Sequence, residues 1–382
     1  MIARLHRHAW MTDEIEAVRA SAEAFVRTEV EPHLPRWREQ GHVDRSAWRK
    51  AGEQGLLLPE LPEEWGGAGM SLAHALAVQD VFAGAEVPPG PMVHSIASHY
   101  ILDYGTEEQK RQWLPKLASG EMFAAIAMTE PGAGSDLQAI TTRADRSGNG
   151  YALNGAKTFI TNGHTADLVV VVAKTDAAAR AAGTSLFVVE TAGQAGFRRG
   201  RMLDKIGHLA SDTSELFFDD MQVPASSLLG GVEGKGFAQL MSQLPYERML
   251  IAVAAAAAID RAVALTIEHA RQRSVFGKPL MEHQNTRFVL AACATTAHVV
   301  RTFVNDCIQR LVDGTLDETA AYMAKAWCSE QQGRVIDDCL QLFGGAGYMR
   351  DMPIGRLFAD ARAQRIYGGS NEVMKELIAR RL

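Results

Sequence analysis

The first third of the chain has apolar residues at helical spacing. Three- and four-residue steps predict an amphipathic helix that starts near Thr12. Its apolar positions are Ile15, Val18, Ala22, Phe25 and Val26. The helical pattern continues to about Phe123, and turn-forming clusters interrupt it at 59–62, 66–69 and 87–91. A helical N-terminal block is therefore expected.

The middle third has a different pattern, with short β-rich runs separated by turn signals such as Asn162-Gly163. The runs are Lys157–Thr161, Leu168–Val172, Ser185–Val189 and Glu215–Phe218. No segment between them is long enough for crossover helices, which predicts a small antiparallel sheet or barrel. Within it, Leu153–Gly163 is expected to form a turn, a strand and a second turn.

Helices return from about Gly234. The segment from Arg248 to His269 contains no proline or glycine and is apolar on nearly every face near its start, so it predicts a buried helix. A second helix is expected from Asp317 to Phe343. Its apolar stripe comprises Ala320, Ala324, Trp327, Cys328, Val335, Cys339 and Leu342. The fold class is thus α+β, mostly α, with domains at 1–123, 124–233 and 234–382.

Composition narrows the function. The 382 residues are 47% hydrophobic and 22% charged, as in ordinary globular proteins. A net charge of −6 disfavours a protein that binds nucleic acid by bulk charge. The four cysteines form no CxxC pair, so no metal site is expected. No uninterrupted apolar run approaches the ~18 residues of a membrane span. The N-terminal MIARLHRHAW lacks an apolar core, so we expect a cytoplasmic protein rather than a secreted or mitochondrial one.

Four glycine-containing segments stand out, whereas the common nicotinamide, P-loop, zinc-protease and serine-hydrolase motifs are absent. Each segment alone has an ordinary structural explanation: a glycine turn, a hairpin, cations at a helix C-terminus, or a capped connector. The segments are MTEPGAGSD at 128–136, LNGAKTFITNG at 153–163, RQRSVFGKPLMEHQ at 271–284, and LFGGAGYMRDMP at 342–353 followed by DARAQRIYGGSNE at 360–372.

In this order and spacing the four segments resemble the acyl-CoA dehydrogenase family. The resemblance extends from about Thr12 to the C-terminus. It implies an N-terminal helical domain, a middle β-barrel-like domain and a C-terminal four-helix bundle. It also implies FAD bound between the last two domains, usually within a homotetramer. The activity implied is oxidation of an acyl-CoA thioester to trans-2-enoyl-CoA.

The resemblance also assigns roles to residues. The first segment would line the flavin, the second would cover its ring, and the others would contact FAD across a subunit boundary or beside the catalytic loop. The cofactor contacts implied are Met128, Thr129, Gly134, Ser135, Phe159, Ile160, Thr161, Arg273, Phe276, Gln284, Gln341, Gly344, Gly345, Ser370 and Glu372. The substrate contacts implied are Ser135, Tyr246, Arg248 and Gly369.

The catalytic base departs from the commonest family pattern. Many members carry a glutamate where this chain has Gly368, which cannot accept a proton. Long-chain and isovaleryl-type members instead place the base before an arginine, which here is Glu247 before Arg248. A structural alternative is a helix that begins at Pro245, with Glu247 favoured by the helix N-terminus. Because a base must exist if the rest of the site does, we expect Glu247 to be catalytic. The N–H of Gly368 would stabilise the substrate carbonyl.

The expected enzyme is therefore an acyl-CoA dehydrogenase close to the long-chain subgroup, with an electron-transfer flavoprotein as partner. An acyl-CoA oxidase is the near alternative, and the chain length favours the dehydrogenase. A non-catalytic assembly protein on the same fold is the other alternative. The prolines within 86–92 should interrupt a helix at the far end of the substrate pocket. That interruption would leave a deep apolar cavity for a long or branched acyl chain; the alternative is that the stretch is only a turn between two helices.

Overall fold

The computed structural model describes residues 8–382, so most of the N-terminal stretch considered for targeting lies outside the described residues. The chain begins with a helical layer, as its pattern predicts. Its helices are α1 (Asp13–Phe25), α2 (Leu34–Gln40), α3 (Arg45–Glu53), α4 (Leu72–Gly84), α5 (Gly90–Tyr104) and α6 (Glu107–Ala118), with a π-helical turn η1 (Val26–Val30) and a 3-10 turn η2 (Glu63–Trp65). The turn-forming segment 85–89 separates α4 from α5, as the prolines predict.

The middle of the chain forms a mixed sheet of seven strands. The strands are β1 (Ala124–Ala127), β2 (Arg143–Ser147), β3 (Gly150–Thr161), β4 (Leu168–Lys174), β5 (Thr184–Glu190), β6 (Phe197–Met202) and β7 (Thr213–Pro224). Their order is β1-β4-β2-β3-β7-β6, with β5 paired to β4. The prediction of an antiparallel sheet was wrong in part, because β1 runs parallel to β4. Strand β2 also pairs in parallel with β4, at one pair of residues. These strands are not consecutive, so no hairpin turn forces them to be antiparallel.

Strand β3 also runs longer than predicted. The sequence Leu153–Gly155 is not a turn but an irregularity within β3, opposite β7. Gly155 has φ 151°, and a Cβ there would lie 2.4 Å from Oγ1 of Thr142. The glycine therefore permits close contact within the sheet rather than a chain reversal. The predicted turn at Asn162-Gly163 is present, with Asn162 at φ 64°.

The C-terminal part is helical and contains the longest element, α7 (Gly236–Gln272). It is followed by the hairpin strands β8 (Ser274–Val275) and β9 (Lys278–Pro279), then α8 (Gln284–Val312), α9 (Glu318–Phe343), the 3-10 turn η8 (Gly344–Tyr348), α10 (Pro353–Gln364) and α11 (Asn371–Ala379). Helices α7 to α10 form the bundle, and α11 packs against α9. Helix α9 covers the segment expected to be helical, and Asp317 is its N-cap. Trp327 is 36% exposed, so this part of the predicted apolar stripe was wrong.

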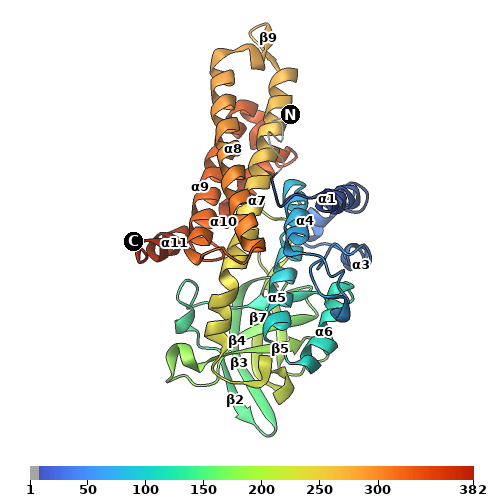
Figure 1. Ribbon diagram of the computed structural model, residues 1–382, viewed down its shortest axis with the longest axis vertical. Helices are drawn as coiled ribbons and strands as arrows, with labels where there is room; N and C mark the ends of the chain where they lie inside the picture. Colours follow the sequence, from blue (N-terminus) through green and yellow to red (C-terminus); the bar gives the residue numbers. More distant parts are fainter. Residues whose placement is uncertain (1–7) are drawn as a thin grey trace.

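The bundle rises away from the sheet, and α7 extends from the sheet to the far end of the bundle (Figure 1). A 37-residue helix is about 55 Å long at ~1.5 Å per residue. Helices α4 and α5 pack against α7 near the sheet, which brings the N-terminal layer to the lower half of the bundle. In the described part of the chain, α7 and α8 are apolar and long enough to cross a membrane; the core helix of a soluble protein passes the same test.

Candidate active site

Glu247 lies inside α7 and is 6% exposed. The helix begins at Gly236, so Pro245 is an interior residue and the alternative that places Glu247 beside a helix N-terminus is wrong. Tyr100 from α5 donates a hydrogen bond of 2.8 Å to Oε1 of Glu247. Burial raises the pKa of the Glu247 carboxyl to about 7, although the Tyr100 hydrogen bond and the Arg248 charge act to lower it. A general base suits this pKa.

Two cations hold the loop after α10. Nε of Arg248 donates to the carbonyl oxygen of Gly368 at 3.5 Å, and Nζ of Lys325 donates to that of Gly369 at 2.6 Å. Both glycines have a positive φ, 65° and 85°, a backbone conformation that residues other than glycine rarely adopt. Among the described residues, the N–H of Gly368 has no acceptor. The loop is therefore fixed, and this N–H is left for a ligand.

The same loop lies against the face of α7 that carries Glu247. A Cβ placed on Gly368 would lie 2.3 Å from Cδ1 of Ile251, which is one helical turn beyond Glu247. The sequence prediction that pairs Gly368 with Glu247 is thus consistent with the geometry: the two positions face one small region. A glutamate at 368 would have to displace Ile251.

Tyr246 lies next to Glu247 but faces α5. Its hydroxyl is 2.9 Å from Oγ of Ser95, and its ring stacks on His99 at 4.5 Å between centroids. Nε2 of His99 is in turn 2.7 Å from Oε1 of Glu60. These buried contacts join the N-terminal layer to α7 beside the base. The substrate-binding role expected for Tyr246 stays a prediction, as does that of Arg248, whose guanidinium lies over the ring of Tyr322 at 4.6 Å.

The glycine loop after β1 is anchored by a buried ion pair. Nζ of Lys157 in β3 donates to Oε1 of Glu130 at 2.8 Å and to the carbonyl oxygen of Met128 at 3.0 Å. Burial opposes the charge on Glu130, but Lys157 and the hydrogen bonds from Thr141 and Thr142 hold its pKa at about 2. Burial lowers the pKa of Lys157 to about 8. The pair fixes the loop against β3.

This anchoring brings two predicted cofactor segments together. The N–H of Thr158 donates to the carbonyl oxygen of Thr129 at 2.9 Å, so Phe159 lies beside the glycine loop. Phe159 is 68% exposed with φ 58° at an irregular point of β3, and Cβ atoms on Gly132 or Gly134 would meet nothing within 4 Å. An exposed aromatic ring beside an open glycine loop fits a flavin ring system.

The remaining residues of these two segments differ in exposure. Ser135 is exposed at the open edge of the loop, and Thr161 is partly exposed at the end of β3. Ile160, in contrast, is 3% exposed and packs inside the sheet. The side chain of Ile160 therefore contributes to the sheet core, and the expected cofactor role of this residue stays a prediction.

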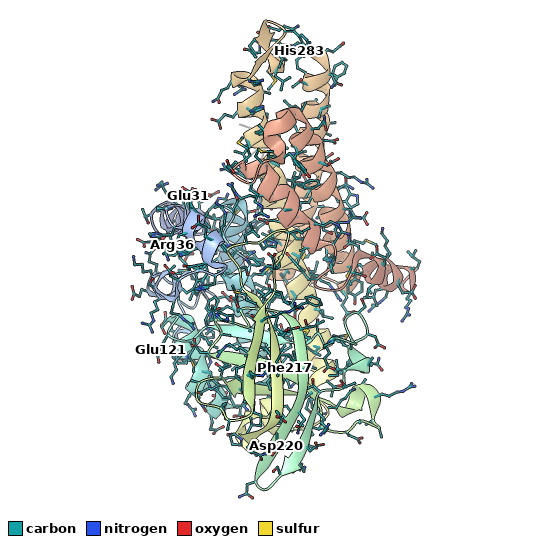
Figure 2. The ribbon with its side chains drawn as sticks, turned by 180° about the vertical axis from the view of Figure 1, so that it is seen from behind. Glu31, Arg36, Glu121, Phe217, Asp220 and His283 are labelled. Carbon is teal, nitrogen blue, oxygen red and sulfur yellow. The ribbon has the colours of Figure 1, made fainter. Side chains whose placement is uncertain are left out.

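Three predicted cofactor residues lie at the opposite end of the bundle. Arg273 caps α7, Phe276 is 97% exposed in the β8–β9 hairpin, and Gln284 begins α8. Figure 2 shows His283, their neighbour, at the free end, while Phe217 marks the distant sheet. Roughly 39 Å of helix separates Glu247 from Arg273 at ~1.5 Å per residue. A single chain does not bring these residues to the glycine loop.

The other predicted cofactor positions form two groups. Gln341, Gly344 and Gly345 are exposed around the end of α9, where Phe343 stacks on His269 of α7 at 4.1 Å. Ser370 caps α11 by accepting a bond from the N–H of Val373. Glu372 follows in the first turn of α11 and is exposed. The cofactor roles of these five residues stay predictions.

A pocket lies against α7, and its lining includes Tyr367, the residue before Gly368, but not Glu247 or Ile251. Glu247, Ile251, Ala254 and Ala258 are spaced by three or four residues and share one face of the helix. The last two line the pocket together with Tyr367 and the segment 86–92. The interruption between α4 and α5 therefore forms one wall of this pocket, and its role in binding the acyl chain stays a prediction.

Part of this wall is polar. Glu86, at φ 57°, is held by Arg38 at 3.0 Å and by Nε of Arg356 at 2.6 Å. Gln332, Gln364, His208 and Asp360 also line the pocket. The expectation of a purely apolar cavity was wrong.

Sequence reasoning missed the partners that hold the site. Tyr100, Lys157, Glu130 and Lys325 lie far along the chain from the groups that they contact. The only sequence signal is the presence of polar residues within apolar segments, as in the stretch HSIASHY of α5. Such residues are buried only when they have partners, which a single sequence does not reveal.

Comparisons with known proteins agree with this architecture. Models of the N-terminal, middle and C-terminal domains of acyl-CoA dehydrogenase match residues 12–121, 125–221 and 234–382. The long-chain specific acyl-CoA dehydrogenase of Sus scrofa mitochondria is 47% identical over 97% of this chain and 87% of its own length. An acyl-CoA dehydrogenase structure from Geobacillus kaustophilus has a TM-score of 0.95 and 43% identity, covering 98% of this chain and 99% of its own.

One solved relative informs the cofactor. The acyl-CoA dehydrogenase of Bacillus anthracis, a structure complexed with FAD, has a TM-score of 0.90 and 30% identity. The match covers 96% of this chain and 66% of the Bacillus anthracis chain. With the open glycine loop beside Phe159, these similarities identify the chain as a member of the acyl-CoA dehydrogenase family, whose enzymes depend on FAD.

Proposed function

We propose that Glu247 is the general base of an acyl-CoA dehydrogenase that acts on long or branched acyl chains. The carrying observation is a carboxyl buried inside α7, with a pKa of about 7, on the helix face that meets Gly368. In the reaction the α-proton passes to Glu247 and the β-hydride leaves the substrate, which yields the trans-2-enoyl thioester. FAD, when bound, supplies the acceptor for that hydride.

The loop at Gly368 stabilises the carbonyl of the thioester. As the α-proton leaves, negative charge develops on the carbonyl oxygen, and a donor aimed at that oxygen lowers the barrier. The unpaired N–H of Gly368 supplies such a donor. Arg248 and Lys325 occupy the carbonyl oxygens of Gly368 and Gly369, so the loop is held in place before substrate arrives. The base thus acts on the α-carbon and the donor on the carbonyl group bonded to that carbon.

The preference for long or branched chains rests on the pocket along α7. On α7 the pocket is lined by Ala254 and Ala258, which lie about 10 and 16 Å of helix beyond Glu247 at ~1.5 Å per residue, so a tail that reaches it from the base is long. The 47% identity to a long-chain specific relative supports the same substrate class. Each buried methylene contributes about 0.8 kcal/mol, so pocket depth translates into chain-length preference.

The electron acceptor and the assembly belong to the same proposal. We take an electron-transfer flavoprotein as the acceptor, in keeping with the family resemblance. The separation of Arg273, Phe276 and Gln284 from the glycine loop supports a homotetramer, in which a neighbouring subunit completes each FAD site. A cytoplasmic location stays a prediction.

Anaerobic reduction of the flavin tests this function. Purified holoenzyme is mixed with butyryl-, octanoyl-, palmitoyl- and methyl-branched acyl-CoA, and bleaching of the flavin absorbance is followed. Reduction that is fastest with palmitoyl- or branched acyl-CoA supports the proposal, and a clear optimum at butyryl-CoA contradicts the chain-length part. No reduction by any thioester would indicate a non-catalytic protein. Rapid oxygen consumption during turnover would indicate an oxidase instead.

A further inference from the structure

The far part of the pocket contains buried polar atoms that have no partner. Oε1 of Gln332, Oε1 of Gln364 and Nε2 of His208 make no hydrogen bond within the described residues. The two glutamines are 1% and 5% exposed, so bulk water does not solvate them freely. Gln332 comes from α9, Gln364 from the end of α10, and His208 from the loop between β6 and β7. Three separate elements thus place unpaired polar atoms around one pocket.

A plain hydrocarbon tail would leave all three atoms unsatisfied. Burying a polar group without a hydrogen bond is costly, and native structures pair nearly all such groups. No cofactor contact expected from the sequence lines this pocket, so FAD does not account for these atoms. Apart from Glu86, the pocket wall at 87–89, 91 and 92 is apolar and suits the hydrocarbon tail itself. The unpaired atoms therefore point to a polar group carried on the tail.

The charges around the pocket decide what kind of polar group fits. Glu86 is already neutralised by Arg38 and Arg356. Asp360 accepts a hydrogen bond from the N–H of His208 and lies 3.9 Å from Nδ1 of its ring. No unpaired cation lines the pocket among the described residues, which disfavours a carboxylate on the tail.

A neutral hydroxyl suits the three atoms. The glutamine oxygens accept hydrogen bonds, and each side-chain amide also carries an NH₂ group that donates them. Nδ1 of His208 is on the side of Asp360, so Nε2 lies on the other side of the ring, where it is able to accept a hydrogen bond. A hydroxyl both donates and accepts, so it is able to satisfy more than one of these atoms at once.

We propose that the far end of the pocket binds a hydroxyl group on the acyl chain, so that long-chain acyl-CoAs hydroxylated near mid-chain are preferred substrates. This inference rests on the proposed function. The stretch from Ala254 to Ala258 lies about 10 to 16 Å beyond Glu247 at ~1.5 Å per residue. An extended chain with C–C bonds of about 1.52 Å reaches this stretch roughly eight to thirteen carbons beyond the α-carbon. A hydroxyl at carbon 12 falls in that range.

The test compares octadecanoyl-CoA with 12-hydroxyoctadecanoyl-CoA in single-turnover flavin reduction by the holoenzyme. Wild type is expected to favour the hydroxylated chain by about tenfold in kcat/KM, the effect of one or two net hydrogen bonds. Gln332→Leu and Gln364→Leu should remove this preference, so that the ratio of the two thioesters falls to about one in each variant. Gln222→Leu, on the exposed edge of β7, serves as the matched control.

The outcomes separate this inference from the proposed function. If wild type reduces at equal rates with both thioesters and the glutamine variants behave alike, water fills the site and the inference fails, although the long-chain function stands. If 6-hydroxyoctadecanoyl-CoA is favoured as strongly as the 12-hydroxy chain, recognition is not at this pocket, which also overturns it. If neither long thioester reduces the flavin while butyryl-CoA does, the proposed function itself has failed. FAD content and thermal midpoint confirm that each variant is folded.

Discussion

Tyr100 donates a 2.8 Å hydrogen bond to Oε1 of Glu247, and the two residues belong to different layers of the fold. The bond stabilises the ionised carboxylate and so opposes the effect of burial, which raises the pKa of Glu247 to about 7. Tyr100 is thus a positioning residue that keeps the base usable near neutral pH. The relationship links α5 of the N-terminal layer to the chemistry on α7.

Replacing Tyr100 by phenylalanine should raise the pKa of Glu247 further. The change removes an interaction that lowers the pKa, so a smaller fraction of the base is ionised at pH 7. Flavin reduction at pH 7 should fall several-fold and recover at higher pH, with the acid limb of the pH profile displaced upward. Tyr104→Phe is the control, because Tyr104 packs near Tyr100 at 6.3 Å but makes no hydrogen bond to Glu247. An unchanged profile in Tyr100→Phe would show that the bond does not tune the base.

Glu247 should also make stability depend on pH. Its pKa rises from 4.5 to about 7 on folding, so the folded state binds the proton more tightly. This contribution to stability is fully present below about pH 4.5 and is lost as the pH rises through about 7. The stability of wild type relative to Glu247→Gln should therefore fall between pH 5 and pH 8, by roughly 3 kcal/mol at most.

Urea unfolding at several pH values measures this difference. Glu121→Gln, which changes an exposed glutamate, is the control and should show no comparable trend. A constant difference between wild type and Glu247→Gln across this range would mean that the carboxyl is not desolvated as described.

Moving the base to position 368 should require a second change. A Cβ at Gly368 would lie 2.3 Å from Cδ1 of Ile251, and the backbone there has φ 65°. In a Glu247→Gln background, Gly368→Glu alone is expected to restore little activity. Adding Ile251→Ala makes room for the side chain and should restore more. Equal rescue with and without the Ile251 change would show that Ile251 does not limit this position.

Glu86 should control the fit of long acyl tails. It joins the 85–89 turn to Arg38 and Arg356, and Glu86→Gln would leave two arginines without a carboxylate. Loosening of the turn should lower kcat/KM several-fold for palmitoyl-CoA but little for octanoyl-CoA, whose tail does not reach the turn. Asp44→Asn, which breaks the exposed pair with Arg36, is the control. An equal loss for both chain lengths would indicate a general loss of folding instead.

Local patterns predicted the helix–sheet–helix order because helical and strand periodicities are properties of short segments. The pairing of Gly368 with Glu247 was expected from the resemblance to long-chain and isovaleryl-type members, and the two positions do face one region of the structure. The start of α7 was not, because Pro245 suits a first helical turn equally well and only packing carries the helix through it. The parallel pairing of β1 with β4 depends on contacts between distant segments.

The polar residues around the site were the least predictable. Tyr100, Lys157 and Gln332 occur in segments where polar residues usually face water, and one sequence does not distinguish an exposed side chain from a buried one with a partner. The partners lie far along the chain, as with Tyr100 and Glu247, so the hydrogen bonds become apparent only in the folded structure. The burial of Gln332 likewise depends on the packing of elements that are distant in the sequence.

The central claim, that Glu247 is the base, is tested most directly by the rate of anaerobic flavin reduction in Glu247→Gln with palmitoyl-CoA. The substitution keeps the size of the side chain, so FAD content and thermal midpoint should stay close to those of wild type. Because a positioned base contributes at least ~100-fold, reduction should slow by two orders of magnitude or more. Near-normal reduction by a folded, FAD-replete Glu247→Gln enzyme would contradict the account.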